Sequence, residues 1–157
     1  MAWDSEAQTQ AFAEALAGKL RASATGANAL IQLHGDLGAG KTTLVRHLLK
    51  ALGVTGRVKS PTYAVAEPYS VADPAAADGM LSIWHFDFFR FNDPDEWEEA
   101  GFRDIFASPG LKLVEWPQKA GSHLPPADLD IHIEMLASET RAVTLTAHTD
   151  AGAALLP

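Results

Sequence analysis

The spacing of apolar residues predicts an amphipathic helix near the N-terminus. Phe12, Leu16 and Leu20 recur every four residues and would form one apolar stripe on a helix. Asp4 or Ser5 can cap this helix, because their side-chain oxygens can accept hydrogen bonds from the first free N–H groups. We therefore expect a helix that ends at about residue 21.

A short strand, a glycine-rich segment and a second helix are predicted next. Residues 29–33 form an apolar run of strand length, and the glycine-rich residues 35–40 follow almost at once. Beyond them, helical spacing continues until Gly53 in the apolar residues Leu44, Val45, Leu48, Leu49 and Leu52.

The rest of the chain is rich in predicted strands. The strand candidates are residues 63–69, which Pro68 interrupts, 81–89, 111–114, 129–135 and 142–147, the last two paired as a hairpin. Turn-forming residues predict a surface loop or hairpin end at 71–79, a short helix at 93–100 and a flexible tail at 150–157. This order of elements indicates an α/β fold with some antiparallel pairing.

Length and composition limit the class of protein. A chain of 157 residues suggests a single domain, residues 1–157, which needs no disulfide or metal to stabilise its core. It has no cysteine, which excludes disulfides, Cys-ligated metals and thiol catalysis. We see no membrane-spanning run and no secretory signal, so we expect a cytoplasmic protein that does not act at a membrane.

The charge balance disfavours nucleic acid as a partner over most of the surface. The formal net charge is −8, which repels a phosphate backbone. One local exception is a basic stretch formed by Arg46, His47, Lys50, Arg57 and Lys59. It is either a solvated helix face with its loop or a contact for an acidic partner or RNA.

The glycine-rich segment carries the strongest chemical signal. Residues 35–42 read GDLGAGKT, which matches G-x-x-x-x-G-K-[ST] at every fixed position. Glycines allow successive N–H groups to face phosphate oxygens, and the following helix adds its positive N-terminal end. Lys41 would reach the outer phosphates and the Thr42 hydroxyl would bind Mg²⁺, whereas the alternative is a plain turn between strand and helix.

Other features narrow the kind of phosphate-loop protein. The sequence has no Asn-Lys pair for reading guanine and no Asp-x-x-Gly element, so specificity for guanine is not expected. A small-molecule kinase would need an arginine-bearing lid, and the scattered arginines do not show one. A kinase and a nucleotide-gated binding module without hydrolysis remain the alternatives to an ATPase.

Two carboxylates lie where predicted strands end. Asp87 is in the aromatic segment HFDFFR, and Glu115 follows the strand at 111–114. Beside a phosphate loop, a carboxylate in this position can serve a metal ion or water, but chemistry alone does not rank the two, and each can be an ordinary surface charge. His85 either orients Asp87 or is a core histidine.

Four segments together resemble one family. HGDLGAGKTT (34–43), VKSPTY (58–63), HFDFFR (85–90) and LVEWPQK (113–119) occur in the order and spacing of the TsaE (formerly YjeE) family, the ATPases of bacterial tRNA threonylcarbamoyladenosine (t6A) synthesis. The resemblance implies a single-domain, three-layer fold like that of P-loop NTPases, with a mostly parallel central sheet and antiparallel additions. It also implies that ATP phosphates bind to Gly35, Asp36, Leu37, Gly38, Ala39, Gly40, Lys41, Thr42 and Thr43.

The same resemblance implies further roles. Thr42 and Glu115 would hold Mg²⁺, and Asp87 would lie near the γ-phosphate and orient water for hydrolysis. Residues 60–63 (SPTY) would form a switch whose Thr62 senses that phosphate. The remaining positions near the nucleotide would be Trp116, Thr9 beside the base, and Arg141. Phe89 departs from the usual tyrosine, so we assign it no polar role.

The family also implies partners. A TsaE-like protein is expected to bind TsaB and TsaD, where TsaD transfers the threonylcarbamoyl group to adenosine 37 of tRNA. ATP hydrolysis would reset that complex between turnovers, and hydrolysis by the isolated protein would be slow. Contact with tRNA is expected only indirectly or through the basic stretch.

Overall fold

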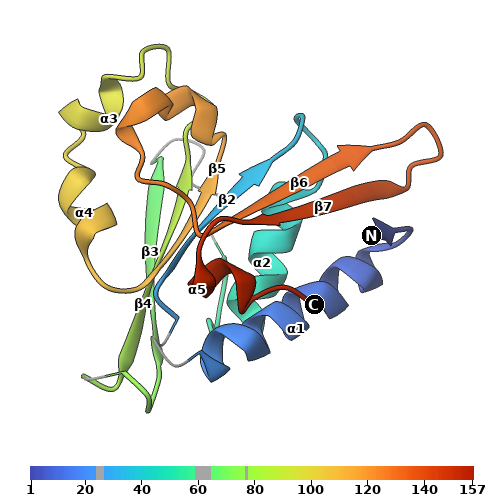
Figure 1. Cartoon of the computed structure of the whole chain (residues 1–157), viewed down its shortest axis with the longest axis horizontal. Helices are drawn as coiled ribbons and strands as arrows, with labels where there is room; N and C mark the ends of the chain where they lie inside the picture. The colour runs from blue at the N-terminus through green and yellow to red at the C-terminus, as the bar shows by residue number, and fades with distance from the viewer. Residues whose placement is uncertain (24–26, 59–64, 77) are drawn as a thin grey trace.

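A mixed β-sheet forms the centre of the protein (Figure 1). The computed structural model describes residues 1–23, 27–58, 65–76 and 78–157. In these residues the sheet has seven strands in the order β1-β7-β6-β2-β5-β4-β3. Their bounds are β1 Ala2–Trp3, β2 Ala29–His34, β3 Ala66–Ala72, β4 Met80–Asp87, β5 Leu111–Glu115, β6 Leu129–Met135 and β7 Arg141–Ala147.

The middle of the sheet is parallel and its two sides are antiparallel. Strands β6, β2, β5 and β4 run in the same direction, while β7 with β1 on one side and β3 on the other pair antiparallel. The α/β prediction is confirmed, as is the hairpin of the last two long strands. Among the described residues, three strand pairs are parallel and three are antiparallel. The hairpins β3–β4 and β6–β7 flank the parallel centre, and β1 pairs with β7 from the other end of the chain.

Helices cover both faces of this sheet (Figure 1). The long helices α1 (Glu6–Ala22) and α2 (Lys41–Ala51) pack on one face, where they share a core with Ile31 and Leu33. The opposite face is covered by the short segments α3 (Glu96–Glu99), α4 (Arg103–Ala107) and η1 (Pro117–His123), and its core contains Leu30 and Phe86. Neighbouring residues of β2 thus enter different cores, as the two-residue period of a strand requires.

The start of α1 differs from the prediction in its capping. Ser5 is the N-cap residue, but its side chain makes no capping bond. The Asp4 backbone N–H instead donates to the Gln8 side chain. The predicted apolar stripe is confirmed, because Leu16 and Leu20 are buried and Phe12 packs against Trp3 with 5.2 Å between ring centroids.

Pro68 does not interrupt its strand. It lies inside β3, opposite Trp84 of β4. A proline is tolerated there because β3 is an edge strand of the sheet that the described residues form, so its outer side has no neighbour in that sheet to receive an N–H. The hairpin end predicted at 71–79 is confirmed, since the Asp73 N–H donates to the Gly79 carbonyl oxygen at 2.8 Å.

The C-terminal residues are packed, in contrast to the expected flexible tail. They form the short helix α5 (Asp150–Ala153), whose N-cap hydroxyl of Thr149 accepts the Gly152 N–H at 3.0 Å. Leu155 is buried in the main core, and the Lys19 ammonium donates to the Leu156 carbonyl oxygen at 2.6 Å. The helix cap and the buried Leu155 side chain therefore hold residues 150–157 against the core, although their composition alone predicted a flexible tail.

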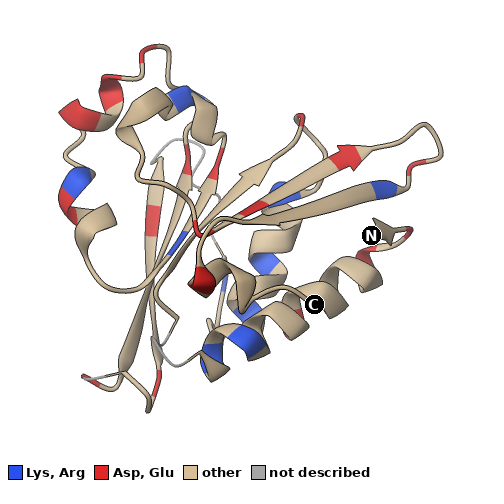
Figure 2. Cartoon of the chain, in the orientation of Figure 1, with Lys and Arg blue, Asp and Glu red and all other residues tan. Residues whose placement is uncertain are grey.

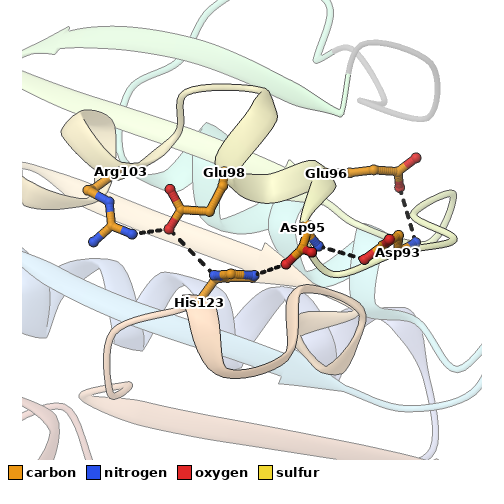
Figure 3. A network of polar contacts seen from close by, with 6 residues as sticks. All are labelled: Asp93, Asp95, Glu96, Glu98, Arg103 and His123. Carbon is orange, nitrogen blue, oxygen red and sulfur yellow. Dashed lines mark hydrogen bonds and ion pairs between the residues drawn. The ribbon is translucent and has the colours of Figure 1, made fainter.

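Charged residues are distributed unevenly over the elements (Figure 2). The basic stretch is divided: Arg46 and Lys50 are exposed on α2, but His47 pairs with Glu6 of α1 at 2.9 Å, and Lys59 lies outside the described residues. On the opposite side, the acidic α3 is tied to η1 and α4. His123 contacts Asp95 at 2.9 Å and Glu98 at 3.5 Å, and Glu98 also pairs with Arg103 (Figure 3).

None of the helices formed by the described residues combines the length and the apolar composition that a membrane span requires.

Two glycines provide a test of the C-terminal packing. A Cβ atom on Gly152 would overlap the Asp128 carbonyl oxygen, whereas one on Gly18 of α1 would meet nothing within 4 Å. We expect Gly152→Ala to lower the free energy of unfolding by roughly 1–3 kcal/mol or more. Gly18→Ala should raise it by about 0.5–1 kcal/mol, because alanine is the better helix former. Urea denaturation measures both, and a Gly152→Ala protein as stable as the wild type would contradict the packed terminus.

Candidate phosphate-binding site

Three parallel strands end at one place beside α2. The register pairs Glu115 of β5 with Leu33 of β2 on one side and with Asp87 of β4 on the other. The glycine-rich loop leaves the sheet just after β2. A cavity of about 330 Å³ opens there, lined by Leu37, Gly38, Ala39, Gly40, Lys41, Thr42, Thr43, Asp87, Phe89, Arg90, Glu115, Trp116 and Arg141. Most of the site residues predicted from sequence therefore surround one cavity.

The loop needs glycine at both of its ends. A Cβ on Gly35 would lie 2.5 Å from the Ile133 carbonyl oxygen of β6, so the backbone could not approach that strand with any other residue. Gly40 has a φ of 109°, and a Cβ there would lie 3.0 Å from Nε of Arg141. That Nε donates to the Ala39 carbonyl oxygen at 2.7 Å, so β7 holds the loop in shape.

Lys41 provides a partly desolvated cation in the loop. Its ammonium donates to the carbonyl oxygens of Gly35 and Asp36, the latter at 3.1 Å, and lies 4.2 Å from the ring centroid of Trp116. Burial lowers the pKa of Lys41, although the carboxylates of Glu115, Asp87 and Asp36 act in the opposite direction. Lys41 begins α2, and the first N–H groups of a helix have no carbonyl partner within it. The cation and these donors together suit an oxyanion.

Thr42, Glu115 and His85 form a hydrogen-bonded chain. The Thr42 hydroxyl donates to Oε1 of Glu115 at 2.9 Å, and Nε2 of His85 lies 2.6 Å from Oε2 of the same carboxylate. His85 is completely buried and the Glu115 side chain is 2% exposed. The hydroxyl and carboxylate oxygens are ligands of the kind that Mg²⁺ prefers. His85 is therefore a core histidine in its burial, as one of the two interpretations held, but its contact is with the Glu115 carboxylate and not with that of Asp87.

Asp87 faces the same cavity from the end of β4. Its Oδ1 accepts the Phe89 N–H at 2.9 Å. Burial raises the pKa of Asp87, and the neighbouring charge of Glu115 adds to the rise, while the Phe89 N–H, His85 and Lys41 reduce it. A carboxyl group with a raised pKa beside a cavity is suited to accepting a proton or holding a water molecule.

Some predicted residues lie elsewhere. Thr9 is buried in α1 and does not line the cavity, so its place beside a base stays a prediction. Gly35 and Asp36 line a second cavity of about 430 Å³ between the loop and the end of β6, and their carbonyl oxygens accept hydrogen bonds from the Lys41 ammonium. Residues 60–63, with Thr62, lie outside the described residues.

Two lining residues were not predicted. Phe89 packs against Trp116, with 4.9 Å between ring centroids, and Arg90 follows it along the cavity wall. Trp116 itself has a positive φ of 56°, which turns the chain directly after Glu115. The closeness of Phe89 and Arg90 to Asp87 in the sequence is the signal that could have found them.

The fold and site define a class of protein. A glycine-rich loop between a buried strand and a helix, with carboxylates at adjoining strand ends, gives the chain a fold like that of P-loop NTPases. Residues 3–143 match the family described as "Threonylcarbamoyl adenosine biosynthesis protein TsaE". The chain belongs to the TsaE family, as the resemblance of its four motifs predicted.

Individual relatives agree with this assignment. The chain is similar to the tRNA threonylcarbamoyladenosine biosynthesis protein TsaE of Haemophilus influenzae, with 42% identity over 123 residues, 78% of this chain and 73% of the relative. The Bacillus subtilis protein of the same name is 36% identical over 129 residues, 82% and 76% of the two chains. The crystal structure of Bacillus subtilis YdiB has a TM-score of 0.73 and 27% identity, covering 99% of this chain and 88% of that one.

The buried position of Asp87 predicts a stability that depends on pH. Because the pKa of Asp87 is raised in the folded protein, ionisation of this carboxyl group lowers the free energy of unfolding. The loss is absent below the pKa that Asp87 has in the unfolded chain, and it develops as the pH rises through the pKa in the folded protein. Asp87→Asn keeps the acceptor for the Phe89 N–H and removes the charge. The variant should therefore melt above the wild type at neutral pH, with the difference shrinking as the pH falls towards about 4.

Asp78→Asn is the matched control, because Asp78 accepts the Met80 N–H at 3.1 Å in the same two-residue pattern but on the surface. Melting curves of the three proteins across this pH range test the prediction. If the melting temperature of Asp87→Asn at neutral pH is no higher than that of Asp78→Asn, the prediction is contradicted.

Proposed function

We propose that this protein binds ATP with Mg²⁺ at residues 35–42 and hydrolyses it in support of t6A formation on tRNA. The observation that carries the proposal is the contact of Thr42 with Glu115 beside Lys41, with Asp87 paired to Glu115 across the strands. This arrangement brings a cation, two metal-type oxygen ligands and a second carboxylate to one cavity.

The phosphates would be held by the loop and the start of α2. Backbone N–H groups of the first helical turn are suited to phosphate oxygens, and the Lys41 ammonium neutralises part of the charge. Arg141 supports this surface from β7 through its bond to Ala39. The aromatic pair of Phe89 and Trp116 forms the wall of the cavity beside Lys41.

The oxygen chemistry of Thr42 and Glu115 fits Mg²⁺, and these two residues would hold it. When bound, the ion supplies positive charge that stabilises the negative charge developing on the phosphates. Asp87 would orient the attacking water through a carboxylate whose Oδ1 is fixed by the Phe89 N–H. A raised pKa suits this carboxyl group to accept a proton in the same step.

In the cell, this hydrolysis would act as a switch. We propose that the protein works in the cytoplasm on a complex of TsaB and TsaD. Residues 60–63 would respond to the γ-phosphate, and its loss on hydrolysis would reset that complex between turnovers. Hydrolysis by the isolated protein would then be slow, and partner binding would accelerate it.

Phosphate release from ATP, with and without purified TsaB and TsaD, tests the proposal. Lys41→Ala should lower the partner-stimulated rate by about 100-fold, as removal of one charge-stabilising donor typically does. Lys50→Ala is the matched control for the rate without partners, because Lys50 is an exposed lysine in the last turn of the same helix. That unstimulated rate should stay within about twofold of the wild type for Lys50→Ala and fall for Lys41→Ala.

Loss of activity in both lysine variants, or in neither, would contradict the assignment to the loop. Stimulation by the partners of less than about twofold would contradict the switch. Radioactive γ-phosphate retained in a small organic product, in place of free phosphate, would indicate a kinase.

A further inference from the structure

We propose that His85 is a positioning residue, which fixes the buried carboxylate of Glu115 in the orientation that a Mg²⁺ ligand requires. This inference rests on the proposed function. The observation behind it is the contact of 2.6 Å between Nε2 of His85 and Oε2 of Glu115, two side chains that are 0% and 2% exposed.

The strand register explains how the histidine reaches its partner. His85 pairs with Leu113 and Asp87 pairs with Glu115, so His85 lies one diagonal step from Glu115 on adjacent parallel strands. Residues two apart on a strand share a face, and therefore His85, Asp87 and Glu115 all lie on the face of the sheet that α2 covers. Thr42 approaches the same carboxylate from the first turn of α2.

Each oxygen of the Glu115 carboxylate has its own hydrogen-bond partner. A carboxylate is an acceptor, so Nε2 of His85 carries the proton and donates to Oε2, while Oε1 accepts from Thr42. With Oε2 held, the carboxylate cannot rotate freely and Oε1 stays directed to the Thr42 hydroxyl. Partners of this kind behind a metal ligand typically determine its orientation and its affinity for the metal.

The second nitrogen of His85 argues against a purely structural role. Nδ1 is buried and has no hydrogen-bond partner in the described part of the chain. An apolar side chain such as Ile83, two residues earlier on the same face of β4, would fill a buried position without this cost. The hydrogen bond from Nε2 to Glu115 explains why this position holds a histidine despite the cost at Nδ1.

The experiment measures nucleotide binding separately from turnover. Fluorescence titration with mant-ADP, in EDTA and over a series of Mg²⁺ concentrations, gives the nucleotide affinity and the Mg²⁺ concentration of half-effect for each variant. His85→Leu removes the donor, and His85→Gln restores a side-chain N–H. Ile83→Val is the control, because it perturbs the same strand face without touching Glu115.

We expect His85→Leu to need at least about tenfold more Mg²⁺ for half-effect, with its affinity in EDTA within about twofold of the wild type. His85→Gln should recover most of the loss, and Ile83→Val should lose only thermal stability. A merely structural role would lower the melting temperature of His85→Leu without moving its Mg²⁺ dependence, and that result would overturn the inference.

Failure of the inference is distinguishable from failure of the proposed function. Wild-type protein whose mant-ADP affinity does not respond to Mg²⁺ would overturn both. A wild type that responds, with His85→Leu and His85→Gln reduced to the same extent, would overturn the role of the Nε2 donor alone. Should His85→Leu fail to fold, His85→Gln and a His85→Asn variant, whose shorter amide falls short of Glu115, carry the same comparison.

Discussion

Glu115 places a carboxylate inside the protein with 2% of its side chain exposed, and the elements of the site are arranged around it. A charge in such a position is costly unless each oxygen has a donor, and these donors come from Thr42 of α2 and His85 of β4. The carboxylate therefore ties the phosphate loop's helix to two central strands. Local structure around it departs from what stability alone favours: Lys41 is buried, and so is Nδ1 of His85, which has no hydrogen-bond partner among the described residues.

The features that sequence could predict depend on local chemistry. The loop at 35–42 requires glycine at positions 35 and 40, because β6 and Arg141 lie too close to these residues for a side chain. The glycines are visible in a single sequence, so the loop could be predicted. The alternation in 129–135 and 142–147 gave the hairpin of β6 and β7, since one face of each strand is buried. The pairing of Asp87 and Glu115 with the loop followed from strand ends in a parallel sheet.

The features that sequence could not predict depend on partners distant in the chain. Which carboxylate His85 contacts is decided by the register of β4 on β5, and no local pattern contains that register. Pro68 predicts an interrupted strand from sequence alone, because only the sheet order shows that β3 is an edge strand in which a proline is tolerated. The C-terminal residues are ordered because Leu155 enters the core and Lys19 binds the Leu156 carbonyl, contacts made across almost the whole chain.

The central claim is that Thr42 and Glu115 form the metal side of a nucleotide site whose phosphate side is the loop. The most direct test is a crystal structure of the protein with Mg²⁺ and a non-hydrolysable ATP analogue. The account predicts the triphosphate along residues 35–42, with Thr42 and Glu115 at the metal ion and Asp87 facing the terminal phosphate. A nucleotide bound elsewhere, or a metal ion held without contact from Thr42 and Glu115, directly or through water, would contradict it.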